Sequence, residues 1–221
     1  MPRSDFDHQL EELRGAVVTM SSMVDKAIAR SMEALQRQDL DLAHEVIAAD
    51  ADINRKRWEI EELAITLIAT QAPMARDLRN ISSAIHIGTD LERMGDHAAG
   101  IGKIVLDIAH EAPLKPLVDL PRMAEVSRSM LADAISAYIA NDADAARDIA
   151  KRDDVIDDLY NQIYRELLTY MMADPGTINR ATHLLWVAHN VERIGDRVTN
   201  ICERVVFTAT GEYVEGNLSK R

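Results

Sequence analysis

Aromatic residues are scarce in this 221-residue chain, where they make up 4% of the sequence. Aromatic and β-branched side chains favour sheets, whereas Ala, Leu, Met, Glu and Arg, which dominate here, favour helices. Hydrophobic residues nevertheless reach 47%, so a chain of this length can bury one large core or two small ones. The composition therefore predicts an all-α fold.

Cysteine is nearly absent, because Cys202 is the only one in the sequence. An internal disulfide is thereby excluded. The sequence also shows no signal peptide and no apolar run long enough to span a bilayer. We therefore expect a soluble, cytoplasmic protein that does not insert directly into a membrane.

Positive charge is in the minority: 25 Lys and Arg stand against 37 Asp and Glu, for a net charge of −12. Such a field repels the phosphates of nucleic acids and of anionic lipids. We expect no binding to nucleic acid.

Proline is also sparse, and three of the six prolines fall in the segment Glu111–Pro121, where helical periodicity stops. We place the boundary between two halves in this segment. The first repeat is predicted over residues 1–112 and the second over residues 117–215.

Apolar residues recur at steps of three and four through most of the chain, the pattern of amphipathic helices. The first half predicts helices from Phe6 to about Gln38, from Asp39 to Pro73, and from 74–77 to Ile108. The second half predicts helices near 121–140 and 142–172, then a last helix after a break at 174–176. Since the pattern repeats, we expect two pseudo-symmetric three-helix bundles.

One motif occurs twice, as Leu91-Glu92-Arg93-Met94-Gly95-Asp96 and as Val191-Glu192-Arg193-Ile194-Gly195-Asp196. In a helix the Glu and the Asp of each copy lie one turn apart on the same face, where their like charges repel. A second set of polar residues lies upstream in each half: Asp50 with Asn54, and Asp153 with Asp157. These two upstream sets are related by an offset of 103 residues.

The spacing of these acids predicts that they meet. Residues 52 and 94 are the centres of the two sets in the first half, and their midpoint is Pro73; in the second half the midpoint falls at Asp174-Pro175. If each half folds as an antiparallel hairpin about its proline, the acids lie at one level, about 30 Å from the turn at 1.5 Å per residue.

Each half then presents oxygen-bearing side chains from two facing helices, and such donors suit hard or borderline cations such as Mg, Mn, Ca or Fe. Carboxylates also bridge metals, so a multinuclear site is feasible. The candidate metal ligands are Asp50, Asn54, Glu92, Asp96, Asp153, Asp157, Glu192 and Asp196. The alternative is that these acids form surface ion pairs with Arg55, Arg93, Arg193 and Arg197.

Signatures of catalysis and of organic cofactors are lacking. The sequence contains no phosphate-binding loop, nucleophile elbow or dinucleotide fingerprint, and no Glu-x-x-His as a ferritin-like di-iron bundle requires. We therefore expect neither catalytic residues nor a cofactor-binding site beyond the metal ligands, and we expect a protein that is not an enzyme.

The doubled motif and the upstream acidic sets, together with Asp77-Leu78-Arg79 and Leu168-Thr169-Tyr170-Met171-Met172, resemble the PhoU family of bacterial phosphate-uptake regulators over nearly the whole chain. The resemblance implies tandem three-helix repeats that bind divalent or trivalent metal ions, multinuclear iron above all, with zinc, manganese, magnesium and calcium as alternatives. One departure from the family pattern is Asn54, which stands where Asp is more common.

The resemblance also implies partners: a phosphate ABC transporter and a two-component sensor histidine kinase, between which the protein acts as a negative regulator. We expect a homodimer. The leading hypothesis is thus a metal-binding signalling adaptor in phosphate homeostasis. The alternatives are a carboxylate-bridged metalloenzyme in a helical bundle, which requires an enclosed pocket beside the acids, and a helical scaffold in which the acids are only solvated charges.

Overall fold

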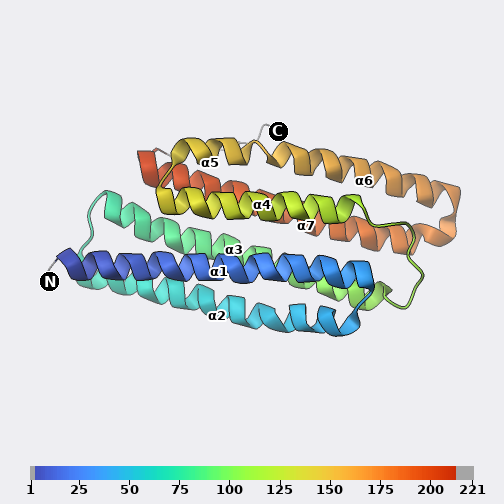
Figure 1. The fold of residues 1–221 in the computed structure, drawn as a ribbon, viewed down its shortest axis with the longest axis horizontal. Coiled ribbons are helices and arrows are strands. Elements are labelled where there is room, and N and C mark those ends of the chain that lie inside the picture. The colour runs from blue at the N-terminus through green and yellow to red at the C-terminus, as the bar shows by residue number, and fades with distance from the viewer. Residues whose placement is uncertain (1–2, 213–221) are drawn as a thin grey trace.

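The computed structural model describes residues 3–212, which form helices and contain no strand. The predicted all-α fold is confirmed (Figure 1). The first half contains α1 (Arg3–Arg37), α2 (Leu40–Gln71) and α3 (Arg76–Ile108). The second half contains α4 (Asp119–Ala140), α5 (Ala143–Ala150), α6 (Asp153–Ala173), the 3-10 turn η1 (Pro175–Thr177) and α7 (Ile178–Thr210).

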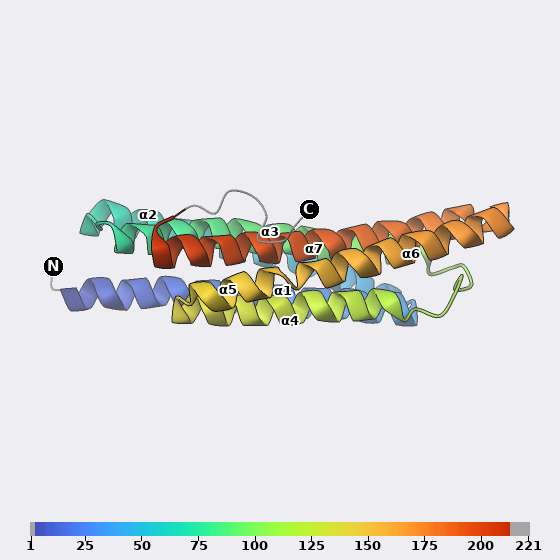
Figure 2. The same ribbon diagram turned by 90° about the horizontal axis from the view of Figure 1, so that it is seen from above.

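The helices form two antiparallel bundles that lie side by side along one long axis, as Figures 1 and 2 show. Helix α3 packs against α7 and α1 packs against α4, so both bundles share one continuous apolar core. The turn between α2 and α3 and the turn between α6 and α7 lie at opposite ends of the molecule (Figure 1). The two repeats are therefore related by an approximate two-fold axis, as the duplicated pattern predicts.

The second helix of each repeat begins at an aspartate cap. The Asp39 carboxylate accepts a hydrogen bond from the backbone N–H of Leu42 at 2.9 Å. The Asp142 carboxylate accepts from the N–H groups of Asp144 and Ala145, at 3.1 and 3.0 Å. These side chains satisfy N–H groups that have no partner within the first turn of a helix.

The second half departs from the expected helices at two places. The helix expected over 142–172 is broken at Lys151 and Arg152, whose backbone forms a turn between α5 and α6. The Arg152 guanidinium reaches α4 at this break, where it donates to Ser129 Oγ at 2.9 Å and pairs with Asp133. Pro121, which we expected to end the linker, lies inside the first turn of α4. Proline is tolerated there because the N–H groups of the first turn have no partner within the helix.

Residues 109–118 connect the two bundles and overlap the segment Glu111–Pro121, where helical periodicity stops. The predicted end of the second repeat, residue 215, lies outside the described residues. Within residues 3–212, no helix combines the length and the apolar character needed to cross a membrane.

Candidate functional site

The upstream acids and the doubled motif face each other across both hairpins, which confirms the predicted register. A Cβ built on Gly95 of α3 would lie 3.3 Å from Asp50 Oδ1 of α2. A Cβ built on Gly195 of α7 would lie only 2.7 Å from Asp153 Oδ1 of α6. Glycine thus lets the carboxylate of the facing helix approach the motif helix closely in each repeat.

The first acid cluster consists of Asp50, Asn54, Glu92 and Asp96. Burial raises the pKa of Asp50, and the negative charge of Asp96 raises it further. Asn54 donates to Asp50 Oδ2 at 3.0 Å, which opposes this rise, while Asp50 Oδ1 is buried without a hydrogen-bond partner. The pKa of Glu92 is also raised, by burial and then by Asp96.

The second acid cluster consists of Asp153, Asp157, Glu192 and Asp196. Asp153 is only 3% exposed, and burial together with the charges of Asp196, Asp157 and Glu192 raises its pKa to about 7. Burial and Asp196 likewise raise the pKa of Glu192, whose Oε2 atom is buried and accepts no hydrogen bond. This cluster therefore holds more uncompensated negative charge than the first.

Cations near the first cluster explain part of this difference, and the sequence analysis did not identify them. The charge of Lys103 lowers the pKa of Asp50, and the charge of Arg57 lowers that of Glu92. The signal was available, because Arg57 follows Asp50 by seven residues and Lys103 follows Asp96 by seven, which is one face of each helix. The matching positions in the second repeat are Tyr160 and Glu203, neither of which is a cation.

Surface ion pairs, the alternative reading of the acids, do form within each motif. Arg93 lies 3.7 Å from Glu92 and 3.4 Å from Asp96. Arg193 lies 3.2 Å from Glu192 and 3.1 Å from Asp196. The other two arginines named for this reading pair elsewhere, Arg55 with Asp52 and Arg197 with Asp90. None of these ion pairs involves Asp50 or Asp153.

The donor atoms of the two clusters are oxygens, which suit a hard cation, but as they stand they are not arranged around a single ion. Nowhere in residues 3–212 do three carboxylate, imidazole or thiolate side chains lie close enough together to hold a metal ion as they stand. The clusters nevertheless offer oxygen donors only, a buried carboxylate oxygen that accepts no hydrogen bond in each, and a glycine that leaves room beside it. Rotation of side chains in each cluster would be needed to bring the oxygens onto one ion.

The seam between α3 and α7 contains a second set of polar contacts that the sequence analysis missed. Buried Asp90 accepts a hydrogen bond from Asn200 at 3.1 Å and lies 3.5 Å from Arg197. At the equivalent positions of the other repeat, Asn190 Oδ1 lies 3.0 Å from His97 Nδ1. The offset of 100 residues relates Asp90 to Asn190 and His97 to Arg197, so this signal was present in the duplication. These contacts fix the two repeats against each other.

The sequence matches the family model of the PhoU domain twice, over residues 17–105 and 120–205. The chain belongs to the PhoU family. It is 41% identical to a phosphate-specific transport system accessory protein PhoU homologue of Clostridium acetobutylicum, over 98% of this chain and all of that protein. The homologue of the same description from Caulobacter vibrioides is 42% identical, over 97% of this chain and 94% of that one.

Solved PhoU structures have the same fold. The crystal structure of the phosphate transport system regulatory protein PhoU from Streptococcus pneumoniae superimposes with a TM-score of 0.89 at 35% identity, over 95% of this chain and 99% of that one. PhoU from Pseudomonas aeruginosa gives a TM-score of 0.89 at 33% identity, over 94% and 100%. The names of these relatives describe accessory and regulatory proteins of phosphate transport and no catalytic activity.

Proposed function

We propose that this protein is a non-enzymatic regulator of phosphate uptake and of phosphate-starvation signalling. The observation that carries the proposal is the likeness to PhoU accessory proteins over almost the full length of both chains. In this role it acts in the cytoplasm as a homodimer and as a negative regulatory adaptor between a phosphate ABC transporter and a sensor histidine kinase.

Deletion of the gene tests this role. We expect phosphate-responsive genes, measured with a reporter, to be expressed in phosphate-rich medium in the deletion strain and to be repressed again by the wild-type gene. A reporter that responds to phosphate in the same way with and without the gene would contradict the regulatory role.

The proposed regulator also binds metal ions at the two acid clusters. The support is the chemistry of the donors: like charges raise the pKa of buried Asp153 and of half-buried Asp50, Glu92 and Glu192, and Asp50 Oδ1 is buried without a hydrogen-bond partner. A bound cation supplies the positive charge that these acids lack. Iron, manganese, magnesium, calcium and zinc are the candidates, and carboxylate bridging accommodates more than one ion per cluster.

The metal proposal predicts a difference between the clusters, because the second has four carboxylates and the first has three and the neutral Asn54. Asp157→Asn should weaken metal binding by the second cluster, and Asn54→Asp should strengthen binding by the first, each by about tenfold, which changes the metal-induced stabilisation by about 1.4 kcal/mol when the metal is in large excess over Kd. The measurement is the rise in thermal unfolding temperature when manganese or iron(II) is added to chelator-treated protein. If neither substitution changes that rise, these two positions are not ligands.

A metalloenzyme finds less support. The structure contains a cavity of about 280 Å³ beneath the linker, lined by residues such as Ile108, Leu117 and Leu184, and none of the eight acid-cluster residues lines it. An enzyme of this kind needs an enclosed substrate site at the metals. We therefore retain the regulator as the proposed function.

A further inference from the structure

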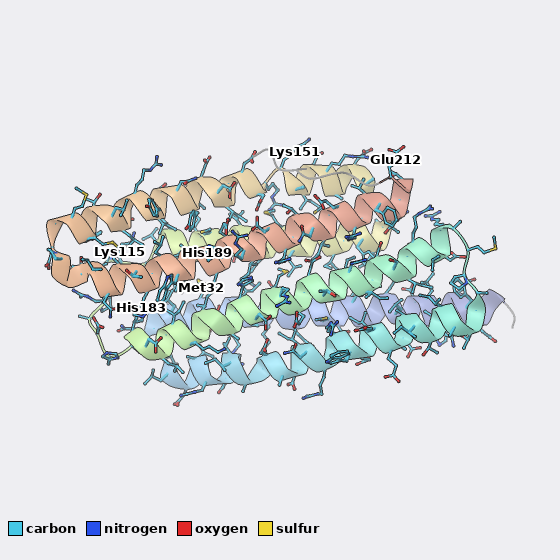
Figure 3. All side chains as sticks on the ribbon, turned by 180° about the vertical axis from the view of Figure 1, so that it is seen from behind. Met32, Lys115, Lys151, His183, His189 and Glu212 are labelled. Carbon is cyan, nitrogen blue, oxygen red and sulfur yellow. The ribbon has the colours of Figure 1, made fainter. Side chains whose placement is uncertain are left out.

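The linker, residues 109–118, covers a cavity of about 280 Å³ that we call the linker cavity. Its floor includes three buried side chains: Leu35 in the last turn of α1, Ile108 at the end of α3, and Leu184 on α7. Figure 1 shows the linker at the end of the molecule where α6 and α7 meet, and Figure 3 shows Lys115 at this end. The walls of the cavity therefore come from both repeats and from the segment that joins them.

Polar contacts with both repeats fix the linker over the cavity. At the end of α1, the side-chain amide of Gln38 donates to the Glu111 carbonyl at 2.8 Å. On α7, Arg180 Nη1 donates to the Ala112 carbonyl at 3.2 Å. Further along the linker, Lys115 pairs with a carboxylate of α6. The linker is thus anchored at several points on either side of the cavity.

Proline and leucine form the part of the linker that faces the cavity. The residues that line it there are Pro113, Leu114, Pro116 and Leu117. Both leucines are half-buried and pack against the core. Proline fixes the backbone φ angle, so this stretch has little freedom to collapse into the space below it. Because roof and floor are both apolar, the cavity favours the apolar part of a ligand over water.

The volume of the cavity indicates the size of that apolar part. A cavity of about 150 Å³ lined by apolar side chains holds benzene. The linker cavity is nearly twice as large, so it accommodates a body of about two fused rings. Sites for small molecules are lined mainly by apolar side chains, with a few polar groups that orient the ligand.

The charged side chains indicate which polar group the ligand carries. Among the described residues that line the cavity, these are Glu111, Lys115 and Arg180. Lys115 is already paired with α6, whereas Arg180 Nε lies 3.6 Å from Glu111 Oε2, too far for a hydrogen bond. The hydrogen bond from Arg180 to the Ala112 carbonyl uses one of the five N–H groups of a guanidinium. Arg180 therefore retains donors for a carboxylate or a similar planar anion.

We propose that the linker cavity binds a small organic anion with an apolar body of about two fused rings. The body lies between the leucines of the linker and the floor formed by α1, α3 and α7, and the anionic group pairs with Arg180. None of the eight acid-cluster residues lines this cavity, so the site is separate from the proposed metal sites. A ligand held here contacts both repeats at once.

Calorimetric titration of the full chain with naphthoate, in buffer with chelator, tests the site. Naphthoate has two fused rings and one carboxylate, and we expect one molecule to bind per chain. Leu117→Trp should weaken binding at least about tenfold, because the larger side chain fills part of the cavity. Val118→Trp is the matched control, since Val118 is 66% exposed in the same linker and does not line the cavity, and it should leave affinity unchanged. Equal affinities for the two variants, or no saturable binding of naphthoate at millimolar concentration, would overturn the site.

The anionic group is tested with naphthamide, a neutral molecule of nearly the same shape. Naphthamide should bind the wild-type protein about tenfold more weakly than naphthoate does. Arg180→Gln should weaken naphthoate binding to that level and leave naphthamide binding unchanged, which also shows that the cavity persists in this variant. Arg55→Gln removes the same charge at an exposed position on α2 and should change neither affinity. Equal affinity of the two compounds for the wild-type protein, or equal losses of both in Arg180→Gln, would overturn the pairing with Arg180.

Discussion

The two acid clusters occupy equivalent places in the two repeats, yet the number of cations near them differs. Near the first, Arg57, Arg93 and Lys103 oppose the charge of three carboxylates. Near the second, four carboxylates raise one another's pKa with Arg193 as the neighbouring cation. A duplicated fold thus preserves the register of the acids, while residues one or two turns away decide how strongly each cluster attracts a cation.

The backbone at the leading aspartate differs as well. Asp50 lies in the middle of α2, whereas Asp153 is the first residue of α6, after the break at Lys151 (Figure 3) and Arg152. A helix N-terminus stabilises a negative charge by about 0.3–1 kcal/mol. The rise in the pKa of Asp153 from 3.8 to about 7 corresponds to a destabilisation of its charged form by about 4 kcal/mol. Burial and like charges therefore outweigh the helix dipole at this position.

The largest expected effect comes from Asp153→Asn in metal-free protein. Because the pKa of Asp153 is raised in the folded state, folded protein holds a proton that the unfolded chain releases, and stability should fall as the pH rises from about 4 to about 7. The neutral amide removes this fall, so the free energy of unfolding at pH 8 should increase by about 2–4 kcal/mol. Urea unfolding at pH 5 and pH 8, with chelator, measures it.

Asp50→Asn is the matched variant for this measurement. The pKa of Asp50 is raised too, but the Asn54 hydrogen bond and Lys103 oppose the rise, so its gain in stability at pH 8 should be smaller. Equal gains in the two variants would show that the clusters are electrostatically alike.

The motif glycines should give an intermediate effect. A Cβ at position 195 would lie 2.7 Å from Asp153 Oδ1 and from Ile156 Cδ1, so both side chains must move; at position 95 the nearest atom is Ile53 Cδ1 at 3.0 Å. Alanine gains about 1 kcal/mol in helix propensity, and overpacking costs about 1–3 kcal/mol. Gly195→Ala should therefore destabilise the protein by about 1–2 kcal/mol net, and Gly95→Ala by less than about 1 kcal/mol, in urea unfolding. A more stable Gly195→Ala protein would contradict this packing.

The sequence was sufficient to predict the duplication, the register of the acids and the helices, except for the division of residues 142–172 into α5 and α6. Apolar periodicity and the prolines indicate where helices end. In each hairpin the two sets of acids lie at equal distances from the turn, so they meet at the same level. Local pattern did not reveal the break before Asp153, because its Arg152 contacts lie on another helix, at Ser129 and Asp133. The contacts of Asp90 also lie on another helix, since Arg197 and Asn200 are more than one hundred residues away, and only the 100-residue offset between the repeats points to this seam.

The smallest expected effect tests whether nearby cations set the difference between the clusters. Lys103→Glu replaces the lysine that opposes the raised pKa of Asp50 with the residue type found at the equivalent position, Glu203. The pKa of Asp50 should rise further, as measured by carbon-detected NMR titration of its carboxyl group in metal-free protein. Lys103 is exposed, so the change should amount to less than about 1 kcal/mol and should shrink in high salt. Lys151→Glu, at an exposed lysine of the second repeat, makes the same change of net charge and should leave the Asp50 titration unchanged. If both variants shift it equally, the net charge of the protein and not the nearby lysine distinguishes the two clusters.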